Sequence, residues 1–201
     1  MPQKHIKSTL TILSEFLLLW YNKNILVHKE ELIMKTRRLG KTDLQVSEIG
    51  FGGEWLERHP EEESIELIHY ASSKGINILD CWMADPKSRD IIGKGIKDNR
   101  SQWFIQGHIG STWKDEQYFR TRDMKYVRPA FEDLLKRLQT DYIDLGMIHY
   151  VDSEEEWEQI QHSDYLDYIM ELKDKGVIRH IGMSSHNPKV ASKQPNPDMW
   201  R

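Results

Sequence analysis

The chain has 201 residues, of which 38% are hydrophobic and 30% are charged, and its formal net charge is −4. This balance is ordinary for a globular domain and favours neither nucleic acid nor an anionic membrane as a partner. The single cysteine, Cys81, excludes an internal disulfide and an iron–sulfur cluster held by this sequence alone, and it fits a reducing, cytoplasmic compartment.

The first 33 residues form a leader that differs from the rest of the chain. It carries early positive charge and then the apolar run 16–20, but Ser14 and Glu15 interrupt the apolar part and no small-residue cleavage site follows. The run is also too short to span a bilayer. We therefore expect residues 1–33 to be mistranslated upstream sequence, with Met34 as the true start, because codons for residues 29–31 can contain a bacterial ribosome-binding sequence.

From Met34 onward, short apolar segments alternate with longer amphipathic ones, which is typical of a βα architecture. The pattern begins with a hairpin whose two strands we place at 35–39 and 44–47. The remaining strands are predicted at 47–53, 76–80, 103–109, 142–149 and 178–184. The helices between them are predicted at 61–74, 87–97, 124–139 and 154–175.

Five such βα steps predict an α/β fold, an incomplete TIM-type (β/α)8 barrel that comprises strands one to five with a preceding β-hairpin. A doubly wound open sheet can also stop at five strands, but no Gly-x-Gly-x-x-Gly follows the first strand. Polar residues also gather where the predicted strands end, and barrel enzymes place their chemistry there. We assign residues 34–193 to the partial barrel. The residues at the strand ends are Asp80, His108, His149, Ser184 and Ser185.

Four segments in order carry a family resemblance. Residues 40–53, 75–80, 138–149 and 176–185 resemble the opening, the second strand, the fourth strand and the fifth strand of aldo-keto reductases. Residues 53–56 and 106–110 further resemble a bacterial subgroup that carries a C-terminal iron–sulfur module, which would lie beyond Arg201. The resemblance implies a cytoplasmic NADP(H)- or NAD(H)-dependent oxidoreductase that transfers hydride to or from a small carbonyl or alcohol substrate.

The resemblance also implies site residues. In the family a tyrosine donates the proton, a lysine paired with an aspartate lowers the pKa of that tyrosine, and a histidine orients the substrate oxygen. Asp80 and His149 match, whereas Asp85 stands at the tyrosine position and His108 at the lysine position. An imidazole titrates near neutrality, so a histidine held by an aspartate can act as the acid instead. The implied catalytic set is Asp80, Asp85, His108 and His149, with Gly53, Trp55, Ser184 and Ser185 on the nicotinamide side.

Other interpretations of the same residues stay open. His149 can be a structural histidine, and Cys81 is expected to pack as a small apolar residue. Trp55, Trp82 and Trp113 can line a pocket, but two of the three can equally serve barrel-end packing. Carboxylates and imidazoles gathered at one barrel mouth also suit a metal-assisted hydrolase or lyase. A non-functional truncated gene product is the third alternative.

The C-terminal residues 194–201 support that third alternative. They place two prolines, Pro195 and Pro197, where a fifth helix is expected, and we interpret them as the product of a frameshift near Lys193. A barrel that stops at five strands has two unpaired edges, so we expect little activity, weak cofactor binding and self-association through the open edges.

Overall fold

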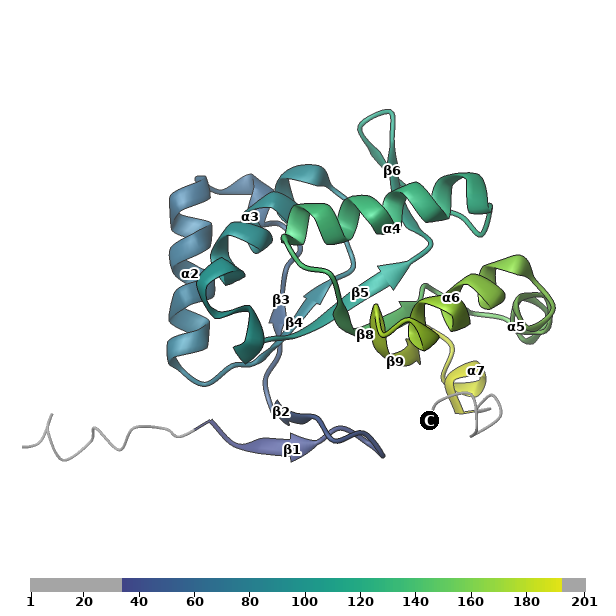
Figure 1. Ribbon diagram of the computed structural model, residues 1–201, viewed down its shortest axis with the longest axis horizontal. Coiled ribbons are helices and arrows are strands. Elements are labelled where there is room, and N and C mark those ends of the chain that lie inside the picture. The colour runs from purple at the N-terminus through teal and green to yellow at the C-terminus, as the bar shows by residue number, and fades with distance from the viewer. Residues whose placement is uncertain (1–33, 193–201) are drawn as a thin grey trace, which may run out of the picture. The chain divides into compact units, whose positions relative to one another are not determined.

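An antiparallel hairpin precedes the main sheet in the computed structural model, which describes residues 34–192 (Figure 1). Strand β1 (Thr36–Arg38) pairs with β2 (Gln45–Ser47) across a turn that contains Gly40 at φ +54°. The Asn77 side chain accepts a hydrogen bond from the Ser47 N–H at 2.7 Å and thereby ties the hairpin to the approach to β4 (Ile78–Cys81). The hairpin predicted at the start of the barrel is confirmed.

Five parallel strands form the main sheet, and they lie side by side in chain order. A doubly wound sheet reverses its strand order at a switch point, so this unbroken order belongs to a barrel wall. The predicted α/β partial barrel is therefore confirmed. The strands are β3 (Phe51–Gly52), β4, β5 (Phe104–Ile109), β8 (Ile143–Ile148) and β9 (Ile178–Met183).

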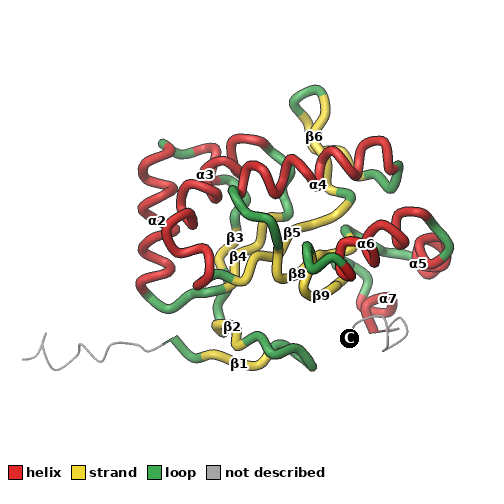
Figure 2. Tube along the Cα trace, in the orientation of Figure 1, coloured by secondary structure: helices red, strands yellow, loops and turns green. Residues whose placement is uncertain are grey.

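Helices return the chain between successive strands and cover the outer face of the sheet, as Figure 2 shows. They are α2 (Glu61–Ser73), α3 (Pro86–Ile96), α4 (Met124–Leu138) and α6 (Asp164–Asp174). Helices α3 and α4 approach closely because position 93 is glycine: a Cβ there would overlap the Arg137 carbonyl group.

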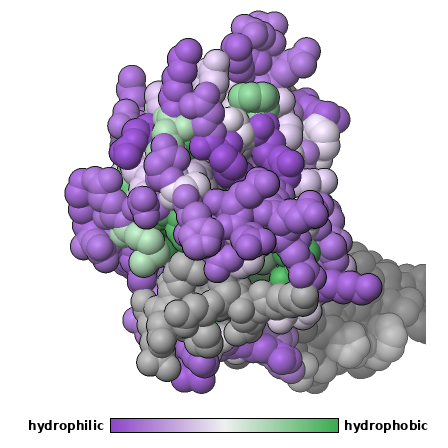
Figure 3. Space-filling view, turned by 90° about the vertical axis from the view of Figure 1, so that its right-hand side faces the viewer, coloured by the Kyte–Doolittle hydropathy of each residue, from purple (hydrophilic) through white to green (hydrophobic). Residues whose placement is uncertain are grey.

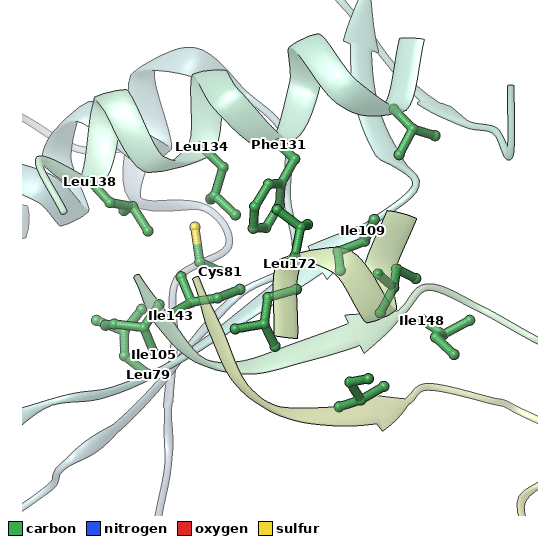
Figure 4. Packing of buried hydrophobic residues seen from close by; sticks show 14 of the residues in the cluster. Leu79, Cys81, Ile105, Ile109, Phe131, Leu134, Leu138, Ile143, Ile148 and Leu172 are labelled. Atoms are coloured by element: carbon green, nitrogen blue, oxygen red, sulfur yellow. The ribbon is translucent and has the colours of Figure 1, made fainter. Parts of the chain in front are cut away.

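The largest apolar cluster lies between the sheet and these helices (Figure 4). Phe131, Leu134 and Leu138 of α4 point toward Leu79 and Ile143 on the strands, and all five side chains are buried. Burying the apolar surface of these side chains away from water is the main free-energy contribution that holds the helices on the sheet. A second, smaller cluster on the inner face joins Leu44 and Val46 of the hairpin region to Leu145 of β8.

The structure differs from the predicted elements in three places. The helix predicted at 154–175 is two helices, α5 (Glu154–Gln161) and α6, because the Ser163 hydroxyl caps α6 by accepting from the Leu166 N–H. An unpredicted hairpin, β6 (Ser111–Lys114) with β7 (Gln117–Arg120), follows β5 and projects from the sheet (Figure 1). The first barrel strand, predicted over seven residues, is reduced to the two residues of β3.

Short elements complete the description: 3-10 helices at Leu56–Arg58 and Lys97–Gln102, and α7 (Pro188–Ser192). Among residues 34–192, no helix is both long and apolar enough to cross a membrane. Hydrophilic residues predominate on the face drawn in Figure 3. The leader prediction for residues 1–33 and the frameshift prediction for 194–201 lie outside the described residues.

Candidate active site

Three neighbouring strands bring together three of the residues predicted for the site. Asp80 lies on β4, His108 on β5, and His149 directly after β8, each at the carboxyl end of its strand. His108 Nε2 is 3.2 Å from Asp80 Oδ1, and His108 Nδ1 is 2.9 Å from His149 Nδ1. The three side chains therefore form one connected group, with His108 in the middle.

Gln106 joins this group from the same strand as His108. Residues two apart on a strand point to the same face, so Gln106 and His108 both face inward. The Gln106 Nε2 amide donates to Asp80 Oδ1 at 3.0 Å and lies 3.3 Å from His108 Nε2. The period of two along β5 was the sequence signal that could have identified Gln106, which was not predicted as a site residue.

Tyr118 extends the group outward from the β6–β7 hairpin. Its hydroxyl oxygen lies 2.6 Å from His149 Nε2, the nitrogen that does not face His108. Trp113 stands directly opposite Tyr118 in the hairpin. Sequence reasoning missed Tyr118 because the turn uses Asp115 and Glu116, both at positive φ, where the common signal would be Asn-Gly or Asp-Gly.

Trp82, predicted as either a pocket or a packing residue, fixes the outer part of the group. Its ring stacks on His149 with 6.0 Å between centroids and meets Tyr118 edge to face at 5.4 Å. The indole Nε1 donates to Glu54 Oε2 at 3.1 Å, which sets the orientation of the ring. Trp82 therefore restricts the movement of both His149 and Tyr118.

Burial makes His149 a neutral group. Burial first, then the adjacent His108 ring and the Arg122 guanidinium, lower the pKa of His149 from 6.5 to about 3. Burial also raises the pKa of the Tyr118 hydroxyl above its ordinary value of 10, despite the opposing effect of Arg120 and Arg122. At neutral pH the outer half of the group is an uncharged imidazole bonded to a protonated phenol.

Comparison with known proteins identifies the family to which this chain belongs. The sequence model described as "Aldo/keto reductase family" matches residues 48–196. The chain belongs to the aldo/keto reductase family. The predicted membership is thereby confirmed, and the matched region contains every strand of the barrel sheet.

Individual relatives of this aldo/keto reductase agree with that assignment. The uncharacterized oxidoreductase YqkF of Bacillus subtilis is 32% identical over 161 residues, which cover 78% of this chain and 51% of the relative. Aldo-keto reductase YhdN of the same organism is 34% identical, covering 76% of this chain and 47% of the relative. The holo form of aldo-keto reductase AKR11C1 from Bacillus halodurans superposes with a TM-score of 0.68 at 31% identity, covering 80% and 53% of the two chains. The chain spans about half the length of the curated relatives it matches.

Asp85, which the sequence resemblance assigns to the tyrosine position of the family, lies at the start of a helix. It is the N-cap of α3, where its Oδ1 accepts a hydrogen bond from the Ser88 N–H at 2.8 Å. Among the described residues its carboxylate makes no hydrogen bond to Asp80, His108 or His149. In this structure Asp85 therefore has a clear structural role at the start of a helix.

The residues predicted for the nicotinamide side have different surroundings in the structure. A Cβ at Gly53 would lie 2.7 Å from the Asp80 carbonyl oxygen, so this position must be glycine for β3 to pack against β4. Trp55 is 45% exposed, and the Arg58 guanidinium lies over its ring. Ser184 Oγ accepts from the Tyr150 N–H at 2.8 Å, which leaves its own O–H to donate.

Ser185 and Cys81 have structural roles, one in hydrogen bonding and the other in packing. The Ser185 hydroxyl donates to Asp152 Oδ1 at 3.1 Å and accepts from the Asn187 N–H at 3.0 Å. Cys81 is buried, and burial raises the pKa of its thiol to about 11, so it is a packing residue as predicted and not an activated nucleophile. In the part of the chain between 34 and 192, no three His, Cys, Asp or Glu side chains are placed to hold a metal ion together.

Proposed function

We propose that this aldo/keto reductase contains an NAD(P)-dependent oxidoreductase site that interconverts a small carbonyl compound and its alcohol. The observation that carries the proposal is the connected group Asp80–His108–His149 at the carboxyl ends of three adjacent barrel strands. That position is where barrel enzymes place their chemistry, and family membership supports the same reaction class.

The side chains suit the polar part of that reaction. Reduction of a carbonyl places negative charge on its oxygen, which must be stabilised and then protonated. His149 Nε2 faces away from His108 toward the mouth of the barrel, with the Tyr118 hydroxyl oxygen 2.6 Å from it, so it can orient the substrate oxygen either directly or through that hydroxyl. The Asp80 carboxylate oxygen lies 3.2 Å from His108 Nε2, close enough to accept a proton that this nitrogen carries.

Two residues at the mouth suit a nicotinamide cofactor, which when bound supplies or accepts the hydride. Ser184 has a hydroxyl hydrogen free to donate toward a carboxamide oxygen, because its oxygen already accepts from Tyr150. Trp55, near the end of β3, is 45% exposed, and the Arg58 guanidinium covers one face of its ring. We propose these two for the nicotinamide side and keep NADP(H) and NAD(H) as alternatives. An iron–sulfur cluster needs cysteine ligands from outside this sequence, which contains one cysteine.

The proposal is tested with the purified 201-residue chain. Tryptophan fluorescence is titrated with NADPH and with NADH, and reduction of a panel of small aldehydes and ketones is followed by loss of the reduced cofactor. We expect His149→Gln to lower kcat/KM by about 100-fold or more, because orientation and proton transfer at the oxygen are both impaired. His69→Gln, which alters an exposed histidine of α2, is the matched control and should retain wild-type turnover.

Cofactor binding is expected to be weak because the sheet has two open edges, so the titration extends to high cofactor concentration. Complete absence of nicotinamide binding by the wild-type chain would contradict the proposal and favour a non-functional product. Equal turnover by the wild type and His149→Gln would show that the site lies elsewhere. Loss of activity on chelation, regained with a divalent metal, would favour the metal-assisted hydrolase or lyase.

A further inference from the structure

The Tyr118 hydroxyl occupies the outer end of the connected group. It lies 2.6 Å from His149 Nε2, the nitrogen that the proposed function assigns to the substrate oxygen. The side chain is 37% exposed, whereas His149 is 4% exposed and His108 is 7% exposed. A small molecule at the barrel mouth would therefore meet the phenol of Tyr118 first and reach the two histidines only through it or beside it.

Hydrogen-bond directions along the group depend on which nitrogen of His108 holds its proton. Two groups meet His108 Nε2: the Asp80 carboxylate, which only accepts, at 3.2 Å, and the Gln106 amide nitrogen, which only donates, at 3.3 Å. When the proton lies on Nε2 toward Asp80, His108 Nδ1 accepts the proton of His149 Nδ1–H. His149 Nε2 is consequently an acceptor, and the Tyr118 O–H donates to it. In this neutral tautomer all three donors point inward, toward Asp80.

One additional proton reverses this order. When His108 is doubly protonated beside Asp80, its Nδ1–H donates to His149 Nδ1, so the proton of His149 lies on Nε2 and donates to the Tyr118 oxygen. The Tyr118 O–H is then free to point outward. The group thus has an inward order and an outward order. The outward order also arises in the neutral ring with its proton on His108 Nδ1, where the Gln106 amide donates to Nε2. The doubly protonated ring differs in that it can give up its Nδ1 proton and become neutral.

We propose that Tyr118 is the catalytic proton donor of this site, and that Asp80, His108 and His149 form a relay that reprotonates it. The inference rests on the proposed function. In the reductive direction the Tyr118 O–H bond breaks and a new O–H bond forms on the substrate alkoxide. The His149 Nε2 proton moves to the Tyr118 oxygen, and the His108 Nδ1 proton moves to His149 Nδ1. The imidazolium of His108 and the alkoxide are both neutralised, and the nicotinamide has supplied the hydride.

The surroundings of His149 allow it to pass a proton between its neighbours but disfavour a second proton remaining on its ring. Burial holds the pKa of His149 low, so this ring exchanges one proton for another without keeping a charge. The stacked Trp82 ring fixes both partners of the outer hydrogen bond. The charged or titratable groups that act on His149 or Tyr118 are His108, Arg120, Arg122, Tyr150 and His186.

The relay is tested first by nuclear magnetic resonance on the full chain with ¹⁵N-labelled histidine. An N–H···N bond between His108 and His149 produces a coupling between their two Nδ1 atoms. We expect that coupling in the wild type. In Tyr118→Phe we expect the His149 Nε2 resonance to shift to that of a nitrogen without a donor. Tyr126→Phe is the matched control, because Tyr126 packs against Phe119 of the same hairpin and lies outside the relay.

Turnover provides the second measurement. We expect Tyr118→Phe to lower kcat by about 100-fold with little change in KM, because the phenol proton acts in the transition state. Tyr126→Phe should leave both constants unchanged. Replacement of Tyr118 by a fluorinated tyrosine keeps the ring and makes the phenol more acidic, so the alkaline limb of the kcat–pH profile should move to lower pH even if Tyr118→Phe folds poorly.

The outcomes separate the relay from the proposed function. Turnover by Tyr118→Phe equal to or above that of the wild type would overturn the inference and show that the hydroxyl merely occupies the substrate position. Absence of the Nδ1–Nδ1 coupling in the wild type would also overturn it. If the coupling is present but no carbonyl compound is reduced, the proposed function fails while the hydrogen-bond relay stands.

Discussion

His149 is a histidine that the fold keeps uncharged, and this has a consequence for stability. Burial and the neighbouring His108 and Arg122 lower the pKa of His149 from 6.5 to about 3. As the pH falls below the ordinary value, the unfolded chain takes up a proton at this position and the folded chain does not. The free energy of unfolding therefore decreases between about pH 6.5 and pH 3.

We predict that His149 contributes about 2 kcal/mol of destabilisation when the pH is lowered from 7 to 5. The measurement is urea unfolding of the wild type and of His149→Gln at both pH values. The wild type should lose about 2 kcal/mol more than the variant over this interval, since other titrating groups contribute equally to both. An equal loss in the two proteins would show that folding does not lower the pKa of His149, which would contradict the prediction.

At the same scale, part of the candidate site could be predicted from sequence and part could not. Asp80, His108 and His149 end apolar strands, and parallel strands in chain order bring their carboxyl ends to one edge, so the structure unites them. The period of two on β5 contained the signal for Gln106. Tyr118 could not be predicted, because its position depends on a hairpin turn built from Asp115 and Glu116.

Among the elements, α3 shows how one residue can support two hypotheses. Family resemblance places Asp85 at a catalytic position, whereas the structure places its carboxylate on the Ser88 N–H at the helix start. The N-cap satisfies one of the four backbone N–H groups that lack a partner inside a helix. The catalytic role of Asp85 stays a prediction, and the capping role is observed.

We predict that Asp85→Ala lowers the free energy of unfolding by about 1 kcal/mol, and that Asp85→Asn lowers it by less, since asparagine also caps helices. Urea denaturation of the three proteins measures both values. If the structural role is the only one, Asp85→Asn retains wild-type turnover. A large loss of kcat in Asp85→Asn with unchanged stability would instead support the catalytic role.

Another error at the element scale also involves a helix cap. The helix predicted at 154–175 continues through the polar residues 161–164, where the Ser163 hydroxyl accepts from the Leu166 N–H and a new helix starts. A polar run that contains a capping serine was therefore the sequence signal for this break. Strand order and helix positions were predictable, because buried parallel strands and amphipathic helices have distinct periods.

For the whole molecule, the barrel wall has two edges within the described residues. Strand β3 pairs only with β4, and β9 pairs only with β8. Unpaired backbone groups on such edges can pair with another strand, so self-association through them stays a prediction from sequence. The integrity of the five-stranded sheet then depends on interactions that connect its strands, among which a buried carboxylate is prominent.

Asp144 of β8 connects three strands through one side chain that is 1% exposed. Its Oδ2 accepts from the Ile105 N–H of β5 at 2.9 Å and from the Arg100 guanidinium at 3.1 Å. Its Oδ1 accepts from Arg179 of β9 at 3.0 Å. Removing this carboxylate would leave a backbone N–H without an acceptor and the mostly buried Arg100 without its counter-charge.

We therefore predict that Asp144→Ala lowers the free energy of unfolding by about 3 kcal/mol, because breaking a buried ion pair leaves an uncompensated charge. The matched control is Arg179→Met, which removes the half-exposed partner and should cost less than about 1 kcal/mol. Urea denaturation of the 201-residue chain measures both. A loss near 3 kcal/mol for both variants would show that the Asp144–Arg179 ion pair to β9 provides most of the stabilisation. A small loss for Asp144→Ala would mean that backbone pairing alone holds β5, β8 and β9 together.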